Sequence, residues 1–146
     1  LIVEPGRSIA GPAGVAVYRV GTVKEIPGVR TYVSVDGGMG DNIRTALYEA
    51  EYEAVAASKM NLKETELVTV AGKYCESGDV LVRDVKLPPM QPDDLIAVPA
   101  SGAYCPSMAS NYNLYGRPAV VMVKEGQARL IRRRETFEDL MIFDVV

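Results

Sequence analysis

The sequence predicts a mainly β domain with a few short helices, built as a β-sandwich or a Greek-key-like, partly open barrel. Short runs of alternating apolar and polar residues, rich in β-branched side chains and bounded by Gly, Pro or Asp, recur along the chain. Helical signals occur in only two segments. With 146 residues, 48% of them apolar, the chain has the size of one ordinary domain and can bury a single core.

The predicted strands follow one another from residue 14 onward. The runs are GVAVYRVGTVKEI (14–26), RTYVSVD (30–36), ELVTVAG (66–72), VLVRDVKL (80–87), LIAVPASG (95–102), AVVMVKEG (119–126) and ARLIRR (128–133). Gly28 and Gly126 lie between neighbouring runs and predict turns, the second as the tip of a hairpin.

Two segments carry helix signals. Asp41 and Asn42 precede good helix formers in residues 43–58, which predicts a helix of at least two turns before the Val- and Ala-rich continuation becomes ambiguous. In residues 136–144, Thr136 and Asp139 have the spacing of a capping box, which favours a short terminal helix.

Composition excludes several classes of function. The net charge of -3 provides no general attraction to nucleic acid or to an anionic membrane. No apolar run is long enough to span a bilayer, and no secretory signal is present, so we expect a cytoplasmic protein. Cys75 and Cys105 have no CxxC spacing and no His accompanies them, which predicts free thiols and no metal site.

Four motifs together resemble one known family. EPGR (4–7), DGGM (36–39) followed by IRTALY (43–48), YCESGD (74–79) and SGAYCPSMASNYN (101–113) are similar, in order and spacing, to the C-terminal part of the diaminopimelate decarboxylases. These are pyridoxal 5'-phosphate enzymes of the alanine racemase and ornithine decarboxylase-like fold type.

The resemblance implies how the chain is organised. In this family an N-terminal α/β barrel precedes a C-terminal β-domain, and that barrel is missing here. Residues 1–14 are expected to be a remnant of the last barrel strand and its following loop, and residues 15–146 the β-domain. Leu1, Ile2 and Val3 are then expected to be disordered or buried in a neighbouring molecule.

The first motif has the chemistry of an anion-binding turn. Pro5 disfavours helical angles at Glu4, and Gly6 allows close approach of the backbone to a ligand. The tetrapeptide alone also fits an ordinary turn with a surface arginine. The resemblance implies that Glu4, Pro5, Gly6 and Arg7 help to hold the cofactor phosphate, that Arg7 reaches a substrate carboxylate, and that Tyr104 contacts the phosphate close to the substrate.

Arg44 and Tyr48 are four residues apart in a predicted helix, so both side chains lie on one face. They could grip one carboxylate, or form a half-buried stack with no ligand. The resemblance assigns them to the substrate, together with Glu76, which would pair with the distal ammonium of diaminopimelate. Glu76 alone would fit a solvated loop.

Cys75 is the predicted catalytic acid. Its acidic neighbours Glu76 and Asp79 disfavour a thiolate, so the sulfur is expected to stay protonated. The family assigns the cysteine of this motif to protonation of the substrate α-carbon after CO2 leaves. A free cysteine is otherwise most often a small buried apolar residue, and this is the interpretation for Cys105.

The resemblance also implies the parent reaction, in which meso-2,6-diaminopimelate is decarboxylated at its D-centre to L-lysine and CO2. The active site is expected to be shared in a homodimer, with Cys75 and Glu76 acting in the partner's site. The Schiff-base lysine is not in this chain, so the isolated chain is expected to be inactive. Two alternatives remain: a β-domain used only for dimerisation or binding, and a domain of a sister decarboxylase for ornithine, arginine or carboxynorspermidine.

Overall fold

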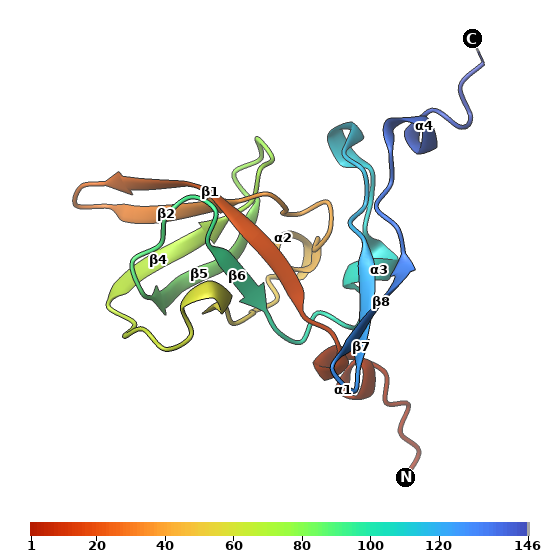
Figure 1. Cartoon of the computed structure of the whole chain (residues 1–146), viewed down its shortest axis with the longest axis horizontal. Coiled ribbons are helices and arrows are strands. Elements are labelled where there is room, and N and C mark those ends of the chain that lie inside the picture. Colours follow the sequence, from red (N-terminus) through yellow and green to blue (C-terminus); the bar gives the residue numbers. More distant parts are fainter. Residues whose placement is uncertain (146) are drawn as a thin grey trace.

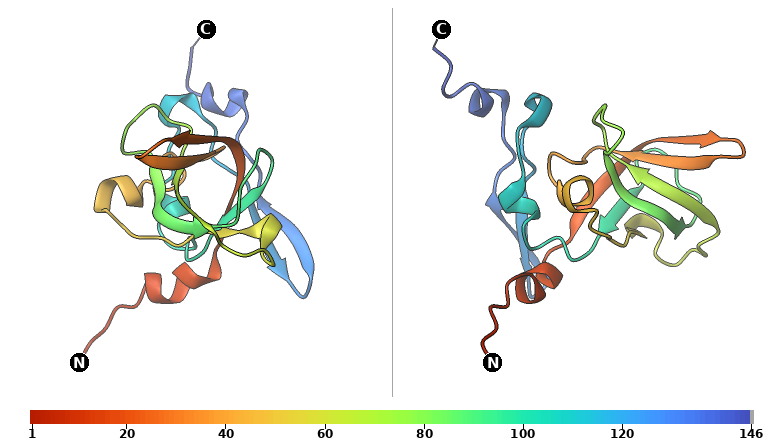
Figure 2. Two further views of the ribbon diagram at one scale, coloured as in Figure 1. Left: turned by 90° about the vertical axis from the view of Figure 1, so that its left-hand side faces the viewer. Right: turned by 180° about the vertical axis from the view of Figure 1, so that it is seen from behind.

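A six-stranded sheet dominates the computed structural model, which describes residues 1–145 (Figure 1). Its strands lie in the order β3-β6-β1-β2-β4-β5. Their bounds are β1 Ala16–Ile26, β2 Arg30–Val35, β3 Val55–Ala56, β4 Glu66–Ala71, β5 Val80–Leu87 and β6 Leu95–Val98. The sheet curls into a nearly closed barrel (Figure 2).

One pair in this sheet sets the positions of the site loops. All neighbouring strands are antiparallel except β2 and β4, which pair in parallel with Val33 opposite Val70. A parallel pair requires a crossover connection. That connection, residues 36–65, carries the short helix α2 (Arg44–Tyr48), strand β3 and the 3-10 turn η2 (Ala57–Lys59).

The core fills the inside of the curled sheet. Val33, Val70, Leu87, Ile96 and Val98 have no exposed surface. They come from four different strands, and each faces inward because alternate residues of a strand point to the same side. The barrel is therefore the rigid body from which the functional loops extend.

A separate hairpin lies beside the barrel (Figure 2). It consists of β7 (Val120–Lys124) and β8 (Gln127–Arg132) and turns at Glu125 and Gly126, both with positive φ, the backbone that a two-residue hairpin loop requires. Helix α4 (Phe137–Leu140) follows, and Thr136 and Asp139 form its capping box. Both predictions are confirmed.

The remaining elements are single turns around the site loops. Helix α1 (Arg7–Ala10) and the 3-10 turn η1 (Gly11–Ala13) precede β1, and helix α3 (Cys105–Met108) and the 3-10 turn η3 (Tyr112–Leu114) follow β6. Leu1, Ile2 and Val3 form an exposed extended segment that points away from the barrel (Figure 1).

All seven predicted strand runs contain a strand, and the mainly β class is confirmed. The prediction of a helix of at least two turns from residue 43 is wrong in its length. Helix α2 ends at Tyr48, because Glu49 adopts a left-handed backbone with φ 52°. The chain then runs extended, burying Tyr52 and Ala54 and pairing β3 with β6. Burial against the barrel outweighs the helix propensity of this alanine-rich segment.

Candidate functional site

Three loops that contain predicted motifs lie side by side at one end of the barrel. Lys73 N–H donates to the carbonyl of Gly37 at 2.9 Å, which joins the YCESGD loop to the DGGM loop. Ser110 N–H donates to the carbonyl of Gly40 at 2.9 Å, which joins the 101–113 loop to the same DGGM loop. The DGGM loop is thus the central one, and it leads directly into α2.

Arg44 lies between two tyrosines. Its guanidinium carbon is 5.7 Å from the ring centroid of Tyr48 and 5.1 Å from that of Tyr104. The side chain of Asn42, which is buried, accepts the backbone N–H of Arg44 at 3.3 Å and orients the start of α2. Arg44 Nε is buried and has no hydrogen-bond partner among residues 1–145. An acceptor from outside the described chain would complete this arrangement.

Arg7 belongs to the same region through Tyr52. The Arg7 guanidinium lies 5.9 Å from the Tyr52 ring centroid, and the Tyr52 hydroxyl is 3.4 Å from Cys105 Sγ. Burial raises the pKa of Tyr52, and the charge of Arg44 opposes this rise. Tyr52 therefore lies near both arginines, a role that its position in a predicted helix did not indicate.

Gly6 and Tyr104 form the candidate phosphate end. A Cβ atom added at Gly6 would lie 3.6 Å from the Tyr104 hydroxyl and near no other described atom. Tyr104 is 48% exposed and has φ 68°, an uncommon backbone for a tyrosine. Open space beside a glycine and a free phenol fits an anion such as phosphate. Glu4 and Pro5 are exposed in the preceding segment.

Cys75 and Glu76 form a second group. Cys75 is exposed, and its Sγ is 3.5 Å from Glu76 Oε1. The Tyr112 hydroxyl donates to the same carboxylate oxygen, and this hydrogen bond is the main cause that holds the pKa of Glu76 below its usual range. Glu76 Oε2 is buried and has no hydrogen-bond partner in the described part of the chain.

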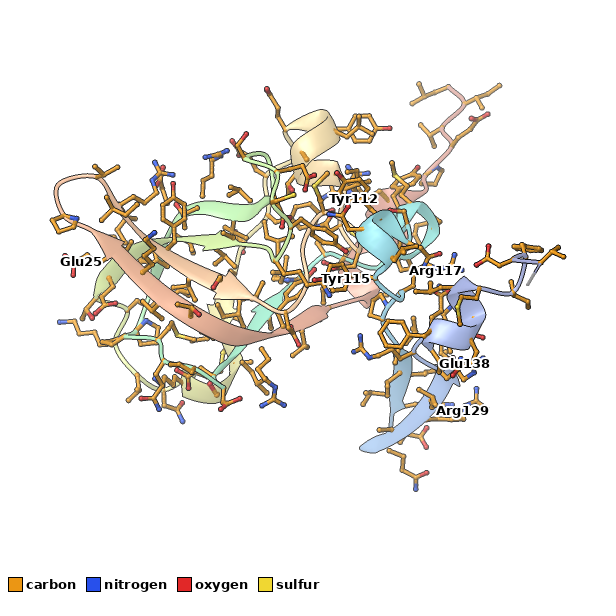
Figure 3. All side chains as sticks on the ribbon, turned by 90° about the horizontal axis from the view of Figure 1, so that it is seen from above. Glu25, Tyr112, Tyr115, Arg117, Arg129 and Glu138 are labelled. Carbon is orange, nitrogen blue, oxygen red and sulfur yellow. The ribbon has the colours of Figure 1, made fainter. Side chains whose placement is uncertain are left out.

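The sequence did not identify Tyr112 as a contact residue. Tyr112 and Tyr115 lie at the end of the barrel opposite Glu25 (Figure 3). The Tyr74 ring contacts Tyr112 at 5.7 Å and Tyr115 edge-on at 5.4 Å. Lys73 Nζ is 3.8 Å from the Tyr115 ring centroid, so a cation–π contact adds to this packing.

A buried tyrosine anchors the central loop. The Tyr18 hydroxyl on β1 donates to Asp41 Oδ2 at 2.5 Å, and Gly38 N–H donates to Asp41 Oδ1 at 2.8 Å. Burial raises the pKa of Asp41, and the two donors oppose this rise. Burial and the nearby Asp41 charge raise the pKa of Tyr18 as well. The pair fixes the loop that precedes Arg44.

Within residues 1–145, no hydrogen bond, ion pair or aromatic contact joins Cys75 or Glu76 to Arg7, Arg44, Tyr48 or Tyr104. The predicted site residues thus form two groups in one chain. A hollow of about 480 Å³ near Leu114 and Phe137 contains none of them. Across the described residues there is no cluster of three metal-ligating side chains and no helix long and apolar enough to cross a membrane.

Comparisons with known proteins identify relatives of the whole chain. Residues 9–102 match the family described as "Pyridoxal-dependent decarboxylase, C-terminal sheet domain". The chain is 58% identical over 141 residues to diaminopimelate decarboxylase of Synechocystis sp., which covers 97% of this chain and 30% of the relative. The chain therefore spans about a third of the length of such relatives.

Solved structures agree with these relatives. The fold matches diaminopimelate decarboxylase from M. jannaschii in complex with L-lysine, with a TM-score of 0.90 and 42% identity over 98% of this chain and 32% of that one. Lysine/ornithine decarboxylase from Vibrio vulnificus with cadaverine matches less well, with a TM-score of 0.67 and 27% identity over 78% of this chain and 31% of that one.

Proposed function

The chain belongs to the pyridoxal-dependent decarboxylase family, whose C-terminal sheet domain it forms, and on that premise we propose that it serves a diaminopimelate decarboxylase. The parent reaction would convert meso-2,6-diaminopimelate to L-lysine and CO2 in lysine biosynthesis. The observation that carries this proposal is Arg44, held between Tyr48 and Tyr104 with its buried Nε free of any partner among residues 1–145.

Pyridoxal phosphate fits the residues present at Gly6 and Tyr104. The open backbone at Gly6 and the hydroxyl of Tyr104 would hold the phosphate, and Glu4, Pro5 and Arg7 would shape the loop around it. When bound, the cofactor withdraws the electron pair that the departing carboxyl group leaves behind. The lysine that binds the cofactor would come from a preceding α/β barrel, in agreement with relatives about three times as long.

Substrate recognition requires one group for each charge at the distal end of diaminopimelate. Arg44 and Arg7 would pair with the distal carboxylate, and the Tyr48 hydroxyl would donate to it. Glu76 Oε2, which has no partner in the described chain, would accept a hydrogen bond from the distal ammonium. Tyr112 holds the other carboxylate oxygen, so the charged acceptor is both ionised and oriented.

Cys75 would deliver the proton to the substrate carbon that lost CO2. Its exposed thiol donates to Glu76 Oε1 at 3.5 Å in this chain. This contact orients the thiol proton, which the substrate carbon would then take. Free thiols at Cys75 and Cys105 also agree with a cytoplasmic location, where reducing conditions preserve them.

We also propose that a homodimer shares each active site, with Cys75 and Glu76 of one subunit completing the site of the other. The absence of contacts between these residues and the Arg44 group within residues 1–145 supports this arrangement. Mixing a Cys75→Ala dimer with an Arg44→Ala dimer tests it, each made in a chimera in which this chain replaces the corresponding domain of the Synechocystis relative. Random exchange should restore about a quarter of the native activity, since half of the dimers gain one intact site. No recovery after subunit exchange would exclude a shared site.

The decarboxylase proposal is tested by a chimera. The chain replaces the corresponding domain of the Synechocystis relative, and CO2 and lysine formation from meso-diaminopimelate are measured with pyridoxal phosphate present. Glu76→Gln is the informative variant and Glu51→Gln, an exposed glutamate outside the predicted site, is its matched control. We expect activity that Glu76→Gln lowers and Glu51→Gln does not.

The same chimera separates the alternatives. Turnover of ornithine, arginine or carboxynorspermidine without turnover of meso-diaminopimelate would indicate a sister decarboxylase. Stable assembly of a chimera that is inactive on all four compounds would indicate a dimerisation or binding module. The isolated chain should show no decarboxylation in the same assay, because it lacks the cofactor-binding lysine.

A further inference from the structure

We propose that Asp79 is a positioning residue that fixes the Cys75–Glu76 turn against the loop leading into Arg44. The inference rests on the proposed function for its catalytic consequence. Its structural basis is the geometry of this one buried carboxylate and the two loops that it joins.

Asp79 closes the turn that presents Cys75 and Glu76. Gly72 N–H donates to the Asp79 carbonyl at 2.9 Å, and Asp79 N–H donates to the Glu76 carbonyl at 3.0 Å. The first bond joins the two ends of the turn, and the second closes its last four residues. The side chain of Asp79 then lies inside the turn and is only 4% exposed.

The carboxylate accepts one backbone N–H from each loop. Tyr74 N–H donates to Oδ2 at 2.8 Å, from the residue directly before Cys75. Met39 N–H donates to Oδ1 at 2.6 Å, from the DGGM loop. Burial raises the pKa of Asp79, with smaller contributions from Asp41 and Glu76, and the two N–H donors oppose this rise. Both oxygens are therefore used to connect the loops.

Two glycines leave room for this carboxylate. A Cβ atom at Gly38 would lie 2.5 Å from Asp79 Oδ1, and a Cβ atom at Gly72 would collide with Oδ2. Each of the two loops thus has a glycine where a larger residue would collide with the Asp79 carboxylate. For both glycines the three atoms nearest to the added Cβ belong to the Asp79 side chain, so the space serves the junction of the loops.

The junction links two functions. From Met39 the chain passes through Asp41 and Asn42 into α2, which carries Arg44. From Tyr74 it passes directly into Cys75. A shift at Asp79 therefore moves Cys75 relative to the body of its own subunit, and so relative to the partner's site that it would complete. Displacement by about 1 Å can cost about 100-fold in rate.

Asp79→Asn tests the proposal because the amide keeps the size of the carboxylate but presents an N–H to one of the two donors. The matched control is Asp94→Asn. Asp94 is another buried aspartate that accepts a backbone N–H, from Gln91 at 2.8 Å, and it pairs with Lys59. Ser58 Oγ also donates to Asp94 Oδ1 at 3.2 Å, and none of these three partners belongs to the predicted site.

The first measurements use the chain itself. Amide hydrogen exchange at Met39 and Tyr74 should accelerate about 10-fold or more in Asp79→Asn, and iodoacetamide should alkylate Cys75 at a changed rate. Asp94→Asn should leave both unchanged. Unchanged exchange at both amides of Asp79→Asn would overturn the proposal. If Asp79→Asn does not fold, Gly72→Ala, which keeps the carboxylate and displaces it, is measured in its place.

The second measurement uses the chimera. Asp79→Asn should lower kcat about 10- to 100-fold and increase the solvent deuterium isotope effect on kcat, because proton delivery becomes slower. Asp94→Asn should change neither quantity, even where it lowers the unfolding temperature. Equal kinetics in the two variants would overturn the catalytic role. An unsubstituted chimera without activity would instead refute the proposed function, and the exchange and alkylation results would still decide the positioning of the loops.

Discussion

Tyr18→Phe should lower the free energy of unfolding by an amount that depends on pH. The substitution keeps the buried ring and removes the hydroxyl that donates to Asp41 Oδ2 at 2.5 Å. Among residues 1–145, the Gly38 N–H is then the one donor to Asp41 that another residue still provides. Loss of a hydrogen bond to a charged group costs about 2 kcal/mol. For a chain of this size we expect a fall in the unfolding temperature of about 5 °C.

The sign of the pH dependence follows from the pKa of Asp41. Burial raises this pKa in the folded chain, so ionisation of Asp41 destabilises the fold as pH rises through the folded pKa. Removing the Tyr18 donor raises the folded pKa further. The loss of stability in Tyr18→Phe should therefore be smallest at acidic pH and should grow toward neutral pH. The loss of stability should increase by about 1.4 kcal/mol for each unit by which the substitution raises the folded-state pKa of Asp41.

Urea unfolding of both chains between pH 4 and 8 measures this difference, in which contributions from other carboxylates cancel. Tyr32→Phe on β2 is the control, because the Tyr32 hydroxyl has no hydrogen-bond partner among residues 1–145. A cost below about 0.5 kcal/mol, or a cost that does not change with pH, would refute the assignment of the Tyr18–Asp41 bond as an anchor of the loop.

Two further predictions concern the second group of site residues. Tyr112→Phe in the chimera should raise KM for meso-diaminopimelate more than it lowers kcat, because the Glu76 carboxylate loses the donor that orients it. Tyr115→Phe, which keeps the aromatic packing, should change KM little, and an equal effect of both variants would contradict the prediction. In the native chain, iodoacetamide should modify Cys75, which is exposed, and spare Cys105, which is 5% exposed. Mass spectrometry of the peptides would contradict this if Cys105 reacted as fast.

Strand positions followed from the sequence because strand burial is periodic. The runs around Val33 and Ile96 alternate in the pattern that one buried face requires, and the turns at Gly28 and Gly126 both have positive φ. The barrel could therefore be located by reading along the chain. The hairpin and the capping box of α4 were predictable for the same reason, since their signals are local.

The length of α2 and the contacts of the site depend on residues that are far apart in the sequence. The end of α2 at Glu49 depends on the burial of Tyr52 against the barrel, which no nearby residue indicates. The hydrogen bond between Tyr112 and Glu76 joins residues that are 36 positions apart. The two N–H bonds to Asp79 depend equally on how the loops meet. Such contacts arise only once the strands have paired, so composition and spacing could not provide them.

The turn between β1 and β2 offers a place for attachment. Val29 is 73% exposed and is the position for attachment, because the neighbouring Gly28 has φ 72°, which favours glycine, although the space beside it holds no atom within 4 Å. Figure 1 shows this hairpin tip at the opposite end of the barrel from α1 and α3. A fluorophore or affinity handle inserted there would lie far from both groups of site residues. Labelled chains could then report subunit exchange while leaving the loops that carry Arg44 and Cys75 undisturbed.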